Sequence, residues 1–144
     1  MSRIYIEDFN VKELEVYRDY SENQLKHYYE PDTGLFIAET PNVIERAMDA
    51  GYVPESFLLE DRFDTDKNRA LYERFPDVPV FITDHDSLKD FTGYNITMGI
   101  LSAMRRKVLP KLEEVCRDAR RIAFLYNVEN PTNTGAIVRA AAAL

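Results

Sequence analysis

Residues 122–144 read IAFLYNVENPTNTGAIVRAAAAL, and this stretch decides the fold class of the chain. The apolar run 122–126 predicts a buried strand, and the polar residues 130–135 predict a turn. The alanine-rich residues that follow predict a helix. Strand, polar turn and helix make up half of a βαβ unit, and such units place their ligands at the turn.

The sequence before residue 122 predicts strands that alternate with helices. Further apolar runs predict buried strands at residues 35–38, 56–59, 80–82 and 99–104. Helices are expected between them, because Thr40-Pro41, Asp66 and either Asp84 or Asp86 are typical helix starts. This alternation predicts an α/β fold with a mainly parallel sheet covered by helices on both faces.

Residues 1–30 are expected to be helical. Val11, Leu14 and Tyr17 share one apolar stripe, and Ser21 is a suitable cap for a second helix. Tyr28-Tyr29 could stack on a nucleobase, but the helical spacing favours packing in the core.

The alternating pattern ends near residue 108, where Leu109-Pro110 interrupts it. We predict one domain over residues 1–108 and a connecting helix or linker over residues 109–121. A second domain is expected to start at residue 122.

The composition favours a cytosolic protein without a metal. Cys116 is the only cysteine, which excludes an intramolecular disulfide. No apolar run reaches the roughly 18 residues of a membrane span. Asp84-His85-Asp86 suggests a metal site, but helix capping is the favoured interpretation, because adjacent residues rarely converge on one ion.

Charge is unevenly distributed along the chain. Residues 1–100 carry 21 acidic and 10 basic side chains, whereas residues 101–144 carry 4 acidic and 8 basic ones. A local phosphate-facing surface is therefore compatible with the net charge of −7. Its candidate residues are Arg105, Arg106 and Lys107, and ordinary solvated side chains are the alternative.

The terminal turn carries the chemistry. Asn133 or Thr132 is expected to cap the helix, which leaves backbone N–H groups facing an anion. Gly135 lets a ligand approach the backbone, and Arg139 lies four residues later on the same helix face. The planar guanidinium of Arg139 is thus expected beside the backbone of Gly135, where a phosphate or an oxyanion could bind. An ordinary βα turn with a helical arginine is the alternative. Neither G-x-x-x-x-G-K-[ST] nor G-x-G-x-x-G is present.

The terminal stretch resembles the first conserved motif of the SpoU/TrmH-type RNA methyltransferases of the SPOUT superfamily. Residues 131–139 contain its core, P-x-N-x-G-A-I-x-R, directly after an apolar run. Parts of residues 38–52 and 88–101 resemble the substrate-binding domain of that family. Thr40 departs from the pattern, because glycine is usual at its position.

The resemblance implies a three-layer α/β/α domain, with a fold like that of kink-turn-binding ribosomal proteins, that presents RNA. It implies that this domain is followed by the first strand–helix unit of a knotted SPOUT domain. In the family, the complete SPOUT domain binds S-adenosylmethionine and forms a homodimer. The implied reaction is methyl transfer to a ribose 2′-hydroxyl of rRNA or tRNA. In the family, the positions matching Asn133 and Arg139 are catalytic or contact the target nucleotide, and Gly135 is expected to lie against RNA.

The second and third motifs of the family, which build the methyl-donor pocket and the knot, are expected beyond Leu144. A lone parallel strand lacks pairing partners. We therefore expect these residues to be a catalytically inactive fragment of a longer enzyme. Two alternatives stay open: a non-catalytic RNA-binding module and an acidic protein-interaction domain.

Overall fold

The computed structural model describes residues 3–30, 32–93, 96, 98–128 and 130–143. The chain divides into two compact units, residues 1–108 and residues 109–144. Each unit is described by itself.

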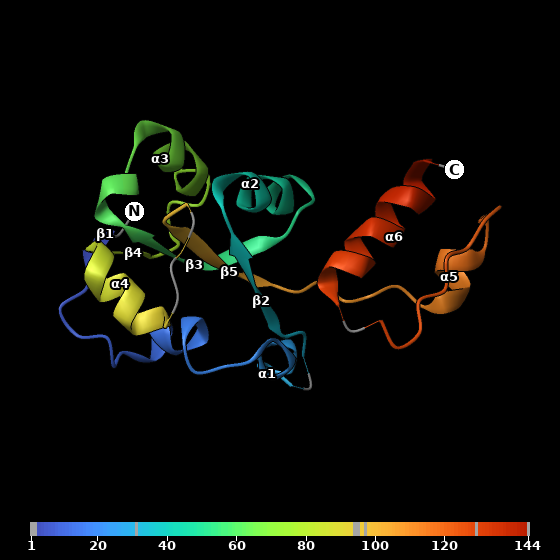
Figure 1. Cartoon of the computed structure of the whole chain (residues 1–144), viewed down its shortest axis with the longest axis horizontal. Helices are drawn as coiled ribbons and strands as arrows, with labels where there is room; N and C mark the ends of the chain where they lie inside the picture. The colour runs from blue at the N-terminus through green and yellow to red at the C-terminus, as the bar shows by residue number, and fades with distance from the viewer. Residues whose placement is uncertain (1–2, 31, 94–95, 97, 129, 144) are drawn as a thin grey trace. The chain divides into compact units, whose positions relative to one another are not determined.

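Residues 1–108 form a mixed α/β fold around a five-stranded sheet (Figure 1). The strand order is β1-β4-β3-β5-β2. The strands are β1 (Arg3–Tyr5), β2 (Leu35–Glu39), β3 (Val53–Glu60), β4 (Val80–Thr83) and β5 (Ile100–Arg105). The four strands predicted in this part of the chain are all present. The short, exposed β1 was not predicted, because residues 1–30 were expected to be helical.

The expectation of a mainly parallel sheet is wrong. β4 runs parallel to β1 and β3, but β5 lies between β3 and β2 and is antiparallel to both. Strands buried on both faces are apolar throughout, whichever way they run. The apolar runs therefore predicted where the strands lie but not their direction.

Helices connect the strands. They are η1 (Lys12–Tyr17), α1 (Glu22–Lys26), α2 (Pro41–Asp49), η2 (Asp61–Phe63), α3 (Asp66–Tyr72) and α4 (His85–Thr92). Ser21, Thr40 and Asp84 accept hydrogen bonds from the first turns of α1, α2 and α4, as predicted. Thr65, not Asp66, caps α3, since its hydroxyl accepts from the Asn68 N–H.

The sheet has a buried apolar cluster on each face, because successive strand residues point to opposite sides. Leu58 packs in one cluster with side chains of η1, α1 and α4. Phe57 and Leu59 pack in the other with side chains of α2 and α3. Leu14 and Tyr17 are buried in the first cluster, as their shared stripe predicts, although η1 is a 3₁₀ rather than an α-helix.

Residues 109–144 contain α5 (Leu112–Cys116) and α6 (Pro131–Ala143). The helix predicted after the terminal turn is therefore present. The strand predicted at 122–126 is not formed, and Ile122, Phe124 and Tyr126 are exposed. A strand needs a neighbour for its backbone hydrogen bonds, and the described residues of 109–144 contain no other strand. None of the described helices is long and apolar enough to span a membrane.

Candidate functional site

The candidate catalytic residues, Asn133 and Arg139, both lie on α6. The side chain of Asn130 starts this helix, since its Oδ1 accepts a hydrogen bond from the Thr132 N–H at 2.8 Å. The Asn130 carbonyl accepts from the Thr134 N–H at 3.1 Å. The expectation that Thr132 or Asn133 caps the helix is therefore wrong. Pro131 takes the first helical position, where its missing N–H is harmless, and so the cap falls one residue before it.

Gly135 and Arg139 lie together, as their spacing predicts. A Cβ atom built on Gly135 would lie 3.4 Å from a terminal nitrogen of Arg139. One end of the guanidinium therefore lies beside the bare backbone of this glycine. The Arg139 side chain is exposed and makes no hydrogen bond or ion pair with any described residue. Its donors are free for an anionic or polar ligand.

Asn133 lies on another side of α6. With 3.6 residues per turn, its side chain is about 120° around the axis from that of Arg139. Asn133 is exposed within the first helical turn. A ligand that touches both residues must therefore reach from the N-terminal end of α6 along its side.

The basic residues at the end of β5 are engaged in the fold. Arg105 forms an ion pair with Glu55, which raises the pKa of the guanidinium above its usual value. Arg106 donates to the Leu35 carbonyl at 2.8 Å. Lys107 donates to the Ala50 carbonyl.

Each of these three cations also lies over an aromatic ring. Arg105 lies 5.5 Å from the centroid of the Tyr29 ring. Arg106 lies 5.7 Å from that of Phe36, and Lys107 lies 4.8 Å from that of Tyr52. Cation–π contacts of this kind stabilise the fold by about 0.5–1 kcal/mol each at exposed sites. The three residues thus have a structural role. Arg106 uses only Nε in its hydrogen bond, and so it keeps donors for a phosphate.

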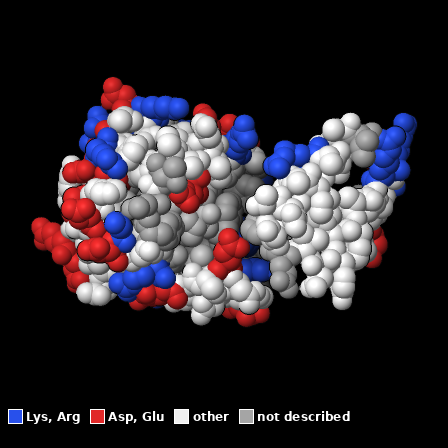
Figure 2. Space-filling model, in the orientation of Figure 1, with Lys and Arg blue, Asp and Glu red and all other residues white. Residues whose placement is uncertain are grey.

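Figure 2 shows how the charges are distributed over each unit. Acidic and basic side chains alternate over the visible face of residues 1–108, while the visible face of residues 109–144 is mostly uncharged. The face of residues 1–108 in this view therefore shows no continuous basic surface.

Thr40 adopts an unusual backbone conformation. Its φ of 82° and ψ of 146° lie in a region that is used almost entirely by glycine. The Thr40 N–H donates to the Ile100 carbonyl at 3.3 Å, and its hydroxyl accepts from the Val43 N–H at 3.4 Å. This conformation explains physically why glycine suits the position.

A buried carboxylate escaped the sequence analysis. Glu60 is 1% exposed at the end of β3, and it pairs with both Arg62 and His85. His85 Nδ1 lies 3.0 Å from Glu60 Oε2. In the sequence, the buried carboxylate could have been suspected from one feature, the acidic residue that directly follows the apolar run 57–59.

Asp84, next to His85, acts as a helix cap, as the favoured interpretation predicts. Its carboxylate accepts from the Ser87 N–H at 2.9 Å, and this hydrogen bond lowers the pKa of Asp84. No group of three metal-ligating side chains occurs among the described residues.

Similarity to known proteins adds to this geometry. No protein-family model matches the chain. Two curated relatives, from Mycobacterium bovis and Mycobacterium tuberculosis, are each named an uncharacterised tRNA/rRNA methyltransferase. Each is 31% identical to this chain over 113 residues. The matches cover 76% of this chain but only 38% of the relatives, so the chain spans well under half of their length.

A solved structure described as an RNA 2′-O ribose methyltransferase has a similar fold. It superposes with a TM-score of 0.57 at 19% identity, over 98% of this chain and 52% of that protein. At this identity the similarity concerns the fold alone. The names of the curated relatives agree with the resemblance to RNA methyltransferases that the terminal motif carries.

Proposed function

We propose, on the premise that this chain is a relative of the SpoU/TrmH-type RNA methyltransferases, that its protein methylates a ribose 2′-hydroxyl of a structured RNA. The RNA is a tRNA or an rRNA, and S-adenosylmethionine is the methyl donor. One observation carries the proposal: on α6, the Arg139 guanidinium lies beside Gly135 and has no hydrogen-bond or ion-pair partner among the described residues. A permanent cation beside open backbone suits a phosphate and a developing oxyanion.

The two units have different roles in this proposal. Residues 1–108 form a three-layer domain like that of kink-turn-binding ribosomal proteins and present the RNA. Residues 109–121 connect it to residues 122–144, which begin a knotted methyltransferase domain. The whole protein acts as a cytoplasmic homodimer. Arg105, Arg106 and Lys107 add phosphate contacts with the donors that the fold leaves unused.

Arg139 acts by electrostatics rather than as a base. A guanidinium with a pKa above about 12 does not accept a proton at neutral pH. Instead, it holds the phosphate next to the target ribose and stabilises the negative charge that develops on the 2′-oxygen. Asn133 orients the ribose, and Gly135 leaves room for it. S-adenosylmethionine, when bound, supplies an electrophilic methyl group, and we assign none of the described residues to its binding.

Methyl-transfer assays with the full-length protein, RNA and labelled methyl donor test the proposal. We expect Arg139→Ala to lower turnover about 100-fold or more, as the loss of an oxyanion-stabilising donor does. Binding of the methyl donor should be unchanged. Arg139→Lys keeps the positive charge but loses the planar guanidinium that can donate two parallel hydrogen bonds, so it should retain intermediate activity. Arg120→Ala removes another exposed arginine and serves as the control.

Near-normal turnover in Arg139→Ala would contradict the catalytic role. The 144-residue chain alone is expected to transfer no methyl group, because its relatives are much longer. If the full-length protein binds RNA in a salt-dependent manner but never binds the methyl donor, it is a non-catalytic RNA-binding module instead.

A further inference from the structure

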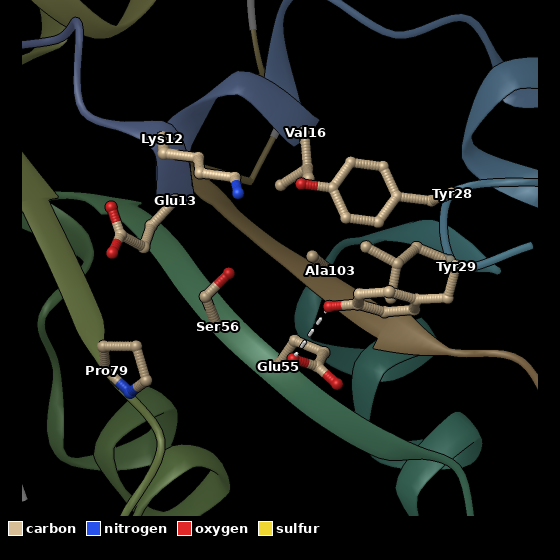
Figure 3. A pocket seen from close by; sticks show the side chains of 10 residues that line it. Lys12, Glu13, Val16, Tyr28, Tyr29, Glu55, Ser56, Pro79 and Ala103 are labelled. Carbon is tan, nitrogen blue, oxygen red and sulfur yellow. Dashed lines mark hydrogen bonds between the residues drawn. The ribbon is translucent and has the colours of Figure 1, made fainter.

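A cavity of about 290 Å³ lies within residues 1–108. It lies between η1, the residues after α1, and strands β3 and β5 (Figure 3). Small-molecule sites usually measure about 300–1,000 Å³, so this cavity suits one small ring system rather than a whole cofactor.

A β-bulge places Glu55 at this cavity. Pro54 pairs with Met104 and Ser56 pairs with Ala103, which leaves Glu55 as the extra residue of β3. Bulges often redirect a side chain next to a binding site. Proline is tolerated within a strand at such a position.

The buried hydroxyl of Tyr17 contacts both strands next to the bulge. It accepts a hydrogen bond from the Ala103 N–H at 3.2 Å and lies 2.8 Å from Ser56 Oγ. The Ser102 hydroxyl donates to the Ser56 carbonyl at 3.0 Å. The Ser56 side of the bulge is therefore held in place by side chains of η1 and β5, which favours a preformed site.

Tyr28 and Tyr29 supply the aromatic surface of the cavity. Their ring centroids are 4.9 Å apart with an interplanar angle of 85°. The Arg105 guanidinium lies over the Tyr29 ring, and the Tyr29 hydroxyl donates to Glu55 at 3.4 Å. Burial raises the pKa of both tyrosines, so both hydroxyls stay protonated at neutral pH. Rings held in place before binding reduce the entropy lost when a ligand stacks on them.

Charges around the cavity are balanced. The side chains of Lys12 and Glu13 line it and make no hydrogen bond or ion pair with any described residue. Glu55, also in the lining, is paired with Arg105. Two carboxylates are thus matched by two cations, which favours a neutral ligand with both donors and acceptors over a phosphate or a cationic peptide.

We infer that this cavity binds one unpaired nucleobase of the RNA substrate, and that guanine is the base it fits best. The inference rests on the proposed function and names the part of the RNA that residues 1–108 recognise. Unpaired bases are typically read by aromatic stacking together with hydrogen bonds to their edges.

The polar side chains of the cavity distinguish guanine from the other bases. Its N1–H and N2–H groups are adjacent donors, which one carboxylate accepts together, and its O6 accepts from an ammonium group. Glu13 supplies such a carboxylate, and Lys12 supplies the ammonium. Adenine and cytosine present one donor next to an acceptor, so the same carboxylate pairs with them less completely.

Binding of three hairpin RNAs to the 144-residue chain tests this inference. The hairpins are identical except for one looped-out position, which is guanine, inosine or an abasic site. We expect the guanine hairpin to bind roughly tenfold more tightly than the abasic one, with inosine between them, since it lacks the N2 amine. Fluorescence anisotropy at low salt measures the affinities.

Matched variants assign the effect to the cavity. Glu13→Gln alters an exposed side chain that has no partner among the described residues, so the fold should be preserved. Most of the preference for guanine over inosine should disappear. Glu73→Gln removes the same charge just after α3, away from the cavity lining, and should keep the preference.

The outcomes separate this inference from the proposed function. If guanine and abasic hairpins bind equally tightly, the cavity does not read a base, although the protein still binds RNA. If no hairpin binds even at low salt, RNA presentation by residues 1–108 fails as well. If a lysine-rich peptide shifts the NMR signals of Tyr28 and Tyr29 and guanosine does not, the cavity belongs to a protein partner.

Discussion

Thr40 stores backbone strain at the start of α2. A non-glycine residue in its conformation costs about 1–3 kcal/mol. The same side chain caps the helix, and replacing a cap by glycine costs only a few tenths of a kcal/mol. Relief of strain should therefore outweigh the loss of the cap.

We predict that Thr40→Gly stabilises the protein by about 1 kcal/mol, measured by urea unfolding followed by circular dichroism. Thr65→Gly is the matched control. Thr65 caps α3 in the same way, but its φ is −89°, so glycine relieves no strain there. This control should be slightly destabilised. Equal effects of the two substitutions would show that Thr40 is not strained.

At the scale of secondary-structure elements, Asp64 joins β1 to α3. Its carboxylate accepts hydrogen bonds from Arg3 of β1 and from Arg69 and Tyr72 of α3. Burial acts to raise the pKa of Asp64, but these hydrogen bonds outweigh it and hold the pKa well below its usual range. β1 is a three-residue edge strand, so this attachment matters for its stability.

We predict that Asp64→Asn destabilises the protein at pH 7 by about 2 kcal/mol, the typical contribution of hydrogen bonds to a charged group. Because the folded-state pKa is lowered, the contribution of Asp64 is complete above the unfolded-state value of about 3.9 and is lost as the pH falls below it. Unfolding free energies measured between pH 7 and pH 2 should show the difference between wild type and variant shrinking in acid.

Asp77→Asn serves as the control, because Asp77 is exposed and makes no hydrogen bond or ion pair with a described residue. It should change neither the stability at pH 7 nor its acid dependence. A difference between wild type and Asp64→Asn that stays constant down to pH 2 would contradict the electrostatic explanation.

For the whole molecule, both apolar clusters lie within residues 1–108. The described part of residues 109–144 contains α5, α6 and several exposed apolar side chains, among them Phe124 at 84% exposure. Stability should therefore come from the first unit, since burial of apolar surface dominates folding.

We predict that residues 1–108 alone unfold cooperatively at the same midpoint temperature as the 144-residue chain. Thermal unfolding followed by circular dichroism compares the two. A clearly lower midpoint or a non-cooperative transition for residues 1–108 would mean that residues 109–144 contribute to the core.

The sequence alone was sufficient for features that depend on near neighbours. The buried strands of residues 1–108, the caps Ser21, Thr40 and Asp84, and the position of Arg139 beside Gly135 all follow from local spacing. Apolar periodicity and i,i+4 geometry determine such features within a few residues, and so they can be read without the fold. The terminal motif likewise indicated the RNA methyltransferases to which the chain is similar.

Only the tertiary structure decided which segments pair and what their pairing brings together. The direction of β5, the bulge at Glu55 and the cavity beside Tyr28 depend on hydrogen bonds between residues far apart in sequence. Residues 122–126 have the apolar composition of a strand, yet they form none without a neighbouring strand. A β-structure needs a second backbone to satisfy its N–H and C=O groups, and a local pattern cannot specify that partner.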